Sequence, residues 1–156
     1  MNETLELQKQ KALDAYETGS KKEKTFLEKL YGKKVFLKEI TERIKTIEDV
    51  LEDNNITQSD IDLMFANTPE HFKHQFIAEL LCKSLNEDWI PNWNDSSEGK
   101  YYPWFKMGSS GFQFHDCATW RTSSLVGSRL CFKSRKLAEY AGQQFEDVYK
   151  QFMITQ

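Results

Sequence analysis

TPEHFKHQFIAELLCKSL, at residues 68–85, carries the strongest structural signal of this chain. Its first residues predict a helix start, since Thr68 offers a capping hydroxyl, Pro69 suits the first helical position and Glu70 suits the first turn. Apolar residues then recur at steps of three and four, which is the spacing of one helix face. The stretch therefore predicts a central core helix, with an apolar stripe formed by Phe72, Phe76, Ile77, Leu80, Leu81 and Leu85.

The sequence before this helix indicates a series of shorter helices. Ser20 and Glu23 have the spacing of a capping box, in which the hydroxyl accepts from a backbone N–H and the carboxylate reaches back. Thr57 and Asp60 repeat the pattern with an aspartate. We expect residues 1–32 to form a helical hairpin appendage. The helices are expected at residues 4–17, from Lys21 to Gly32, and in the segments IEDVLED (residues 47–53) and IDLMF (residues 61–65).

The composition changes at Trp89. All four tryptophans fall within residues 89–120, where Gly, Asn, Asp and Ser mark turns between short segments of strand character. Pro91 and Pro103 favour edge or irregular segments, because proline has no N–H to donate to a ladder. The pattern predicts a small antiparallel sheet of about three to four strands. The strand-like segments are residues 101–107, 111–121 and 128–133.

Ser134 is placed to cap a last helix over residues 135–152, whose apolar residues recur at steps of three and four. Gly142 costs helix stability, and we interpret it as a point of close packing against the sheet. The chain as a whole is typical of the α+β class: a helical N-terminal half, a small antiparallel sheet and a C-terminal amphipathic helix packed on it. We expect a single domain over residues 1–156, with the α+β core in residues 68–156.

Composition and charge narrow the class of protein. The 156 residues are 39% hydrophobic, 29% charged and 13% aromatic, which excludes disordered, collagen-like and disulfide-knot chains. No apolar run is long enough to cross a bilayer and the first residues lack a signal-peptide pattern, so a soluble intracellular protein without membrane contact is expected. Residues 1–99 carry 13 Lys and Arg against 20 Asp and Glu, whereas residues 100–156 carry 8 against 4. This asymmetry indicates a basic face that meets an anion, or two unrelated solvated surfaces.

Cysteine and histidine provide no recognisable reactive site. Cys82, Cys117 and Cys131 are odd in number and widely spaced, so reduced thiols are expected. A zinc site needs close ligand pairs, and the pairs His71/His74 and His115/Cys117 lie in distant regions. We therefore predict no metal, no cofactor and no catalytic residue. An enzyme that uses Cys117 with His115, or a zinc hydrolase, is the least favoured alternative.

The basic, aromatic C-terminal part holds the candidate binding residues. Arginine forks and flat rings suit phosphates and stacked bases. Alternatively, the rings form the core of the sheet and the basic groups form its rim. Arg135 stands at a helix start, where positive charge is unfavourable unless it meets an anion. The candidate ligand-binding residues are His115, Trp120, Arg121, Arg129, Lys133 and Arg135.

Three stretches match a known pattern of motifs: KKVFLKEITERIKTIEDVLEDNNI (33–56), KYYPWFKM (100–107) and GSRLCFKSRKLAEYAGQQFEDVYKQF (127–152). Together with LNEDWIPNWN (85–94), they make the chain resemble a large uncharacterised family of gut Bacteroidetes, their phages and mobile elements. Its motifs read IKTFEDAC, YYPWF and SRLxFKSxELAxYAGKQF. Ile47 and Val50–Leu51 depart from the common Phe and Ala-Cys, so a functional thiol there is not supported. Arg135–Lys136 replaces a more acidic pair.

The resemblance implies a phage or prophage origin and brings no activity, catalytic residue or cofactor. The segment between the YYPWF and GSRL motifs diverges among family members, which suits partner recognition on a fixed scaffold. The sequence thus predicts a non-enzymatic binding module whose partner is a host protein, a nucleic acid or an anionic nucleotide. A virion structural or decoration protein is the alternative, so the location is the cytoplasm of the bacterial host or the virion. Homo-oligomerisation is left open.

Overall fold

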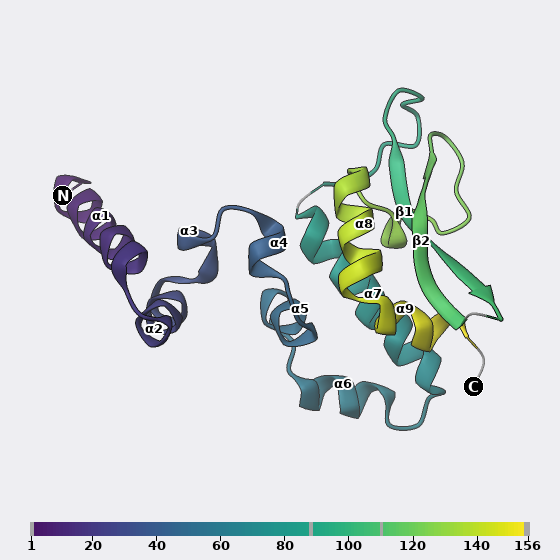
Figure 1. The fold of residues 1–156 in the computed structure, drawn as a ribbon, viewed down its shortest axis with the longest axis horizontal. Helices are drawn as coiled ribbons and strands as arrows, with labels where there is room; N and C mark the ends of the chain where they lie inside the picture. The colour runs from purple at the N-terminus through teal and green to yellow at the C-terminus, as the bar shows by residue number, and fades with distance from the viewer. Residues whose placement is uncertain (1, 88, 110, 155–156) are drawn as a thin grey trace. The chain divides into compact units, whose positions relative to one another are not determined.

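A computed structural model describes residues 2–87, 89–109 and 111–154. The chain forms two compact units, residues 1–43 and residues 44–156. The first unit is helical, and the second contains the hairpin and the remaining helices (Figure 1). The α+β class expected from the sequence is confirmed.

The first unit begins with α1 (Asn2–Thr18), and α2 (Lys21–Tyr31) follows after a short turn. The capping box predicted at Ser20 is present, with Glu23 Oε2 accepting from the Ser20 backbone N–H at 2.7 Å. Tyr16 of α1 stacks on Phe36, with 4.4 Å between the ring centroids. Burial, followed by the hydrogen bond that its hydroxyl donates to Glu28, raises the pKa of Tyr16 to about 12. The unit ends with α3 (Lys33–Phe36) and α4 (Ile40–Arg43).

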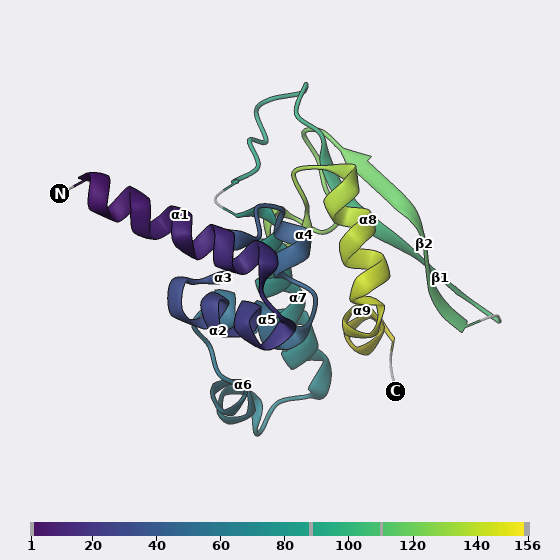
Figure 2. The same ribbon diagram turned by 60° about the vertical axis from the view of Figure 1, so that its left-hand side comes forward.

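The second unit packs its helices on one side of a β-hairpin (Figures 1 and 2). The long helix α7 contacts α5, α8 and α9, while α8 lies on both strands. Ile61, Leu81, Leu85, Phe132 and Ala141 are among the buried residues between these elements. The elements are α5 (Ile47–Asp53), α6 (Gln58–Phe65), α7 (Glu70–Asn86), β1 (Lys100–Gly108), β2 (Gly111–Trp120), a 3₁₀ turn (Ser128–Leu130), α8 (Arg135–Gln144) and α9 (Glu146–Met153).

The sheet has two strands within the described residues, and the expectation of three to four was wrong. The segment around Phe132 makes a single antiparallel bridge to Tyr101, with backbone bonds of 3.0 and 2.7 Å. On its other side the side chain of Asn86 donates to the Cys131 carbonyl at 2.8 Å and accepts from the Lys133 N–H at 2.9 Å. A helix side chain therefore satisfies the backbone groups that a further strand would use.

Three details of the helices differ from expectation. The last helix is divided at Phe145, which leaves the helical region at φ −119° and ψ 31°, so α8 and α9 are separate elements. Phe72, placed in the core by its spacing, is exposed on the first turn of α7. Thr68 does not cap α7, because its hydroxyl donates to the Phe65 carbonyl at 3.1 Å.

Gly142 confirms the expected close packing. A Cβ at this position would lie 2.7 Å from Cε2 of Phe114 and 2.8 Å from Cβ of Pro103. Only a residue without a side chain lets α8 approach the hairpin so closely. Ser134 caps α8 as predicted, accepting from the Leu137 N–H at 3.3 Å.

Candidate contact surface

The hairpin has one face on the helices and an opposite face that the helices do not cover. Alternate residues of a strand point to opposite faces, and Pro103 and Phe105 point toward α8 and α9. Phe105 lies 4.9 Å from Tyr149 of α9, ring to ring. Tyr102 and Trp104 consequently occupy the opposite face, where Trp120 joins them from β2. We call Tyr102, Trp104 and Trp120 the aromatic face.

The aromatic face combines one buried ring with two accessible rings. Trp120 donates its indole N–H to the Tyr102 hydroxyl, which fixes the two rings together. Trp104 lies 6.5 Å from the Tyr102 ring. Trp104 is 47% exposed and Trp120 is 36% exposed, whereas Tyr102 is buried, and burial raises its pKa. Large apolar side chains held rigidly at the surface are typical of a contact site.

A β-bulge positions His115 beside this face. Trp104 pairs with Asp116 and Phe105 pairs with Phe114, so His115 is the additional residue of β2 and has no partner in the register. Its side chain is exposed. Arg121, just beyond β2, donates to the Ser97 carbonyl and ties the end of the strand to the loop before β1. His115, Trp120 and Arg121 are therefore all on β2 or its immediate end.

The other three predicted residues lie apart from one another. Arg129 has its Nε 3.8 Å from a carboxylate oxygen of Glu79 on α7. Lys133 contacts the carboxylate of Glu87 and the Asn86 carbonyl, both at 3.1 Å. These two cations face α7, whereas Arg135 faces β2. The six residues are not brought together around one anion.

Arg135 meets an anion of its own chain. Its guanidinium lies 3.0 Å from the Asp116 carboxylate and donates to the Cys117 carbonyl at 3.2 Å. The Cys117 N–H, followed by Arg135, holds the pKa of Asp116 below its ordinary value. This pairing explains a positive charge at the start of α8 without an external ligand.

Helix side chains also cover the outer edge of β2. Besides the bond from Arg135 to the Cys117 carbonyl, Glu146 of α9 accepts from the Phe114 N–H at 2.6 Å. Asp116 accepts from the Cys117 N–H at 2.7 Å. An exposed strand edge usually offers such groups to another chain. Here side chains of α8, of α9 and of β2 itself occupy these groups around the bulge, so the edge of β2 is covered there.

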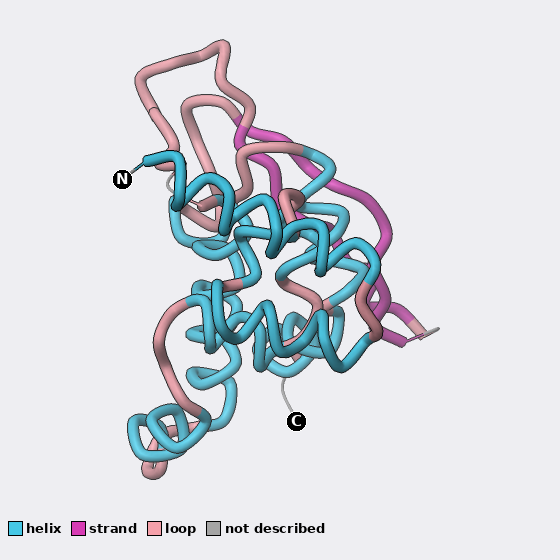
Figure 3. Tube along the Cα trace, turned by 90° about the vertical axis from the view of Figure 1, so that its left-hand side faces the viewer, coloured by secondary structure: helices cyan, strands magenta, loops and turns pink. Residues whose placement is uncertain are grey.

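Lys100 was not among the predicted functional residues, yet it is fully buried at the first position of β1. Its ammonium donates to the carbonyls of Asn92 at 2.5 Å, Asp95 at 3.2 Å and Glu98 at 3.1 Å. The Glu98 carboxylate lies 3.0 Å away and the Trp93 ring 5.4 Å away. This one charge organises the loop before β1, which Figure 3 shows in pink together with the loop after β2. The detectable signal was a lone cation at the end of the polar stretch NWNDSSEGK.

The thiols are not suited to nucleophilic chemistry. Burial raises the pKa of Cys117 to about 12 and that of Cys131 to about 11, and it also raises the pKa of Cys82. A nucleophilic cysteine needs a lowered pKa. Cys117 faces the Arg135 carbonyl at 3.8 Å, whereas His115 is exposed on the bulge. In the described part of the chain, no three His, Cys, Asp or Glu side chains are grouped so as to hold a metal ion.

Comparison with protein-family models, with curated proteins and with solved structures found no match. Across the residues that the structure describes, no helix has both the length and the apolar character needed to cross a bilayer.

Proposed function

We propose that this chain is a non-enzymatic binding module of phage or mobile-element origin, and that it recognises a protein partner through the aromatic face. The observation that carries the proposal is the pair of accessible indoles, Trp104 and Trp120, on the one side of the hairpin that the helices leave open. Tryptophan and tyrosine are enriched at the centres of protein interfaces, because large rigid rings bury much area at low entropic cost. The origin rests on the motif resemblance alone.

Charge distribution favours a protein over a nucleic acid or an anionic nucleotide. Lys133 and Arg135 each have a carboxylate oxygen within 3.1 Å, and a Glu79 carboxylate oxygen lies 3.8 Å from Arg129, so acidic neighbours of the same chain reduce the attraction of these cations for an external anion. Anion binding would require these pairs to separate. A nucleic-acid surface instead presents several cations along one groove.

Site-specific cross-linking tests the proposal. In one variant of the full chain, a photoreactive phenylalanine analogue replaces Trp104. In a second variant of the same chain, the analogue replaces Leu125, an exposed apolar residue of the loop after β2. We expect extracts of the native host to yield a protein adduct at position 104 that is absent at position 125. Trp104→Ser should weaken retention of that protein about tenfold or more, and Leu125→Ser should leave it unchanged.

Two outcomes would contradict the proposal of a protein partner. The first is an adduct with nucleic acid or nucleotide that is lost in the Arg121→Glu/Arg129→Glu variant and at raised salt. The second is that Trp104→Ser retains the cross-linked protein as well as the wild-type chain does. The alternative of a virion structural or decoration protein predicts the chain at stoichiometric copy number in purified particles, which mass spectrometry measures directly.

A further inference from the structure

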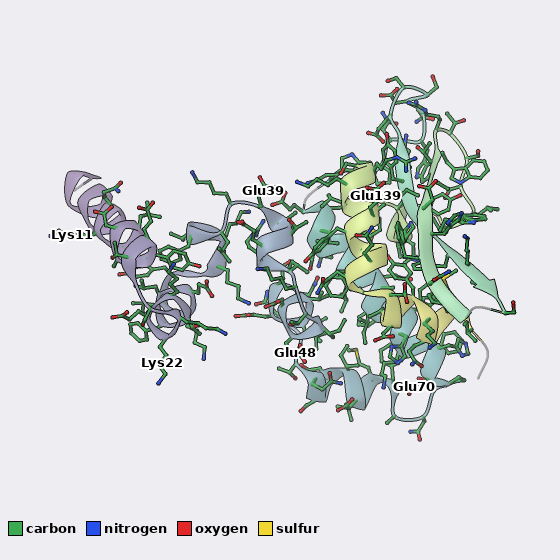
Figure 4. The ribbon with its side chains drawn as sticks, viewed as in Figure 1. Lys11, Lys22, Glu39, Glu48, Glu70 and Glu139 are labelled. Atoms are coloured by element: carbon green, nitrogen blue, oxygen red, sulfur yellow. The ribbon has the colours of Figure 1, made fainter. Side chains whose placement is uncertain are left out.

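Two surfaces of this chain have opposite charge, and each exposes apolar side chains. The segment of residues 21–34, which contains α2, holds six lysines and two glutamates. Residues 48–70, which contain α6, hold seven acidic residues and no Lys or Arg. Figure 4 labels Lys22 on the first segment, and Glu48 and Glu70 at the two ends of the second.

On α2, Phe26 and Leu30 remain largely exposed, although Tyr31 of the same helix packs against Phe36. Tyr16, Phe36 and Glu28 tie α1, α2 and α3 together on one side of the helix. Phe26 and Leu30, four residues apart on one face, are 64% and 60% exposed. Lys22 and Lys29 share that face by helical spacing and are exposed. The result is a basic helix face with an apolar centre.

On α6 the opposite side of the helix is anchored in the core. Ile61 is fully buried and Phe65 lies 5.5 Å from Phe76 of α7, ring to ring. Leu63 is 80% exposed, and the neighbouring Met64 is also exposed. Asp62 adjoins them and is exposed as well. This surface is apolar at its centre with an acidic margin, the complement of the α2 face.

We infer that the chain self-associates, with α2 of one copy on the α6 surface of a second copy. Complementary charge selects this pairing over contacts between two α2 faces or two α6 surfaces, because like charges would then be juxtaposed. A stable interface buries about 1,200–2,000 Å² in total, so two reciprocal contacts in a symmetric dimer are needed. Four apolar side chains per contact are consistent with weak, salt-sensitive association.

Sedimentation velocity of the full chain over about 1–200 µM measures the association, a range that covers micromolar dissociation constants. We expect a monomer–dimer equilibrium that shifts toward monomer at 0.5 M salt, which is about three times physiological ionic strength. Phe26→Ser/Leu30→Ser on α2 and Leu63→Ser/Met64→Ser on α6 should each weaken dimerisation about tenfold or more. The matched control is Leu125→Ser, which removes an equally exposed leucine from another surface and should leave the equilibrium unchanged.

Mixing the two double variants tests which surfaces meet. Each variant alone lacks both contacts of the reciprocal dimer, but the mixture restores one contact between the intact α2 face and the intact α6 surface. We expect the mixture to associate more strongly than either variant alone and more weakly than the wild-type chain, because one of the two contacts is restored. The charge variants Lys22→Glu/Lys29→Glu and Asp62→Lys should behave in the same way.

Other outcomes would overturn the inference. One such outcome is a chain that stays monomeric at every concentration. This includes the case in which α2 and α6 pair within a single chain. The inference would also be overturned if the chain still associates after either surface is changed. The same holds if only Trp104→Ser abolishes association. The last result would place self-association on the aromatic face and leave the α2 and α6 surfaces without a role.

Discussion

Gly142 of α8 lies directly against the ring of Phe114 on β2, with no room for a methyl group between them. The contact sets how deeply the hairpin sits on the helices. The aromatic face lies on the opposite side of the same hairpin, so its position depends on this contact.

Gly142→Ala should therefore destabilise the second unit despite alanine's higher helix propensity. The added Cβ would overlap the Phe114 ring and Pro103. Overpacking of this kind costs about 1–3 kcal/mol, against a propensity gain of about 1 kcal/mol. Urea denaturation followed by tryptophan fluorescence measures the net loss. Gly108→Ala, where the Cβ meets nothing within 4 Å, is the control. A gain in stability of about 1 kcal/mol, which is the effect of helix propensity alone, would contradict the close packing.

Asn86→Ala should lower the free energy of unfolding by about 2–3 kcal/mol, because the buried Cys131 carbonyl and the Lys133 N–H lose their partner together. Asn94→Ala, in the exposed loop before β1, is the matched control and should change it by less than about 0.5 kcal/mol. Chemical denaturation compares them. A small effect at Asn86 would mean that water replaces its amide.

Lys100→Met should loosen the loop before β1. The substitution keeps most of the side-chain volume but leaves three carbonyls without their shared donor, a loss of about 3 kcal/mol. We expect faster proteolysis within residues 92–99 and a shift of Trp93 emission, since the ammonium lies 5.4 Å from that ring. Lys106→Met, at an exposed position of the same strand, should change neither. Unchanged protection of the loop in Lys100→Met would show that the ammonium does not organise it.

The cysteines should react slowly in the folded protein and make its stability fall in alkali. Burial raises the pKa values of Cys117 and Cys131 above those of the unfolded chain. Unfolded thiols therefore ionise first, and stability is lost as pH rises above about 9. A thiol-reactive chromophore at pH 8 should modify none of the three cysteines until denaturant is added. Rapid modification of Cys117 in the folded state would revive the enzyme alternative.

Tyr149→Phe should keep or raise stability. The Tyr149 hydroxyl is buried without a hydrogen-bond partner in the described residues, and burial raises its pKa well above the ordinary value. Removing an unsatisfied hydroxyl avoids its desolvation penalty and should raise the free energy of unfolding by about 1 kcal/mol. Denaturation of Tyr149→Phe beside wild type measures the change. A loss of about 1 kcal/mol or more would reveal a bound water or another partner.

Local signals were sufficient for much of the helical framework. Ser20, Thr57 and Ser134 cap the helices that their patterns predicted, because capping depends on residues three positions apart. Gly142 was recognisable because a glycine inside an amphipathic helix needs a packing reason. Phe72 was misplaced, since periodicity identifies a face without showing where its contacts end.

Contacts between residues far apart in the sequence could not be predicted from local patterns. The third strand is reduced to a single bridge because Ser128–Leu130 form a 3₁₀ turn, and Asn86, more than forty residues earlier, bonds the outer side that a further strand would have used. The positive charge of Arg135 pointed to an anion, yet the sequence could not show that Asp116 provides it. Composition pointed to Trp120 and Arg121, and their role in binding stays a prediction. Trp104, the most exposed ring of the aromatic face, was noted as aromatic content but not as a site, because strand alternation does not show which side the helices cover.

The capped edge of β2 has a consequence for selectivity. A strand that joins a sheet through its main chain can have almost any sequence, so open edges recruit indiscriminately and seed fibrils. Here Glu146 and Arg135 hold the amide and carbonyl groups near the bulge. Under the proposed function, a ligand of the hairpin would instead have to fit the shape of the indoles. Recognition would then discriminate among partners by their side chains, and we expect a change of one tryptophan to alter that choice while the scaffold stays intact.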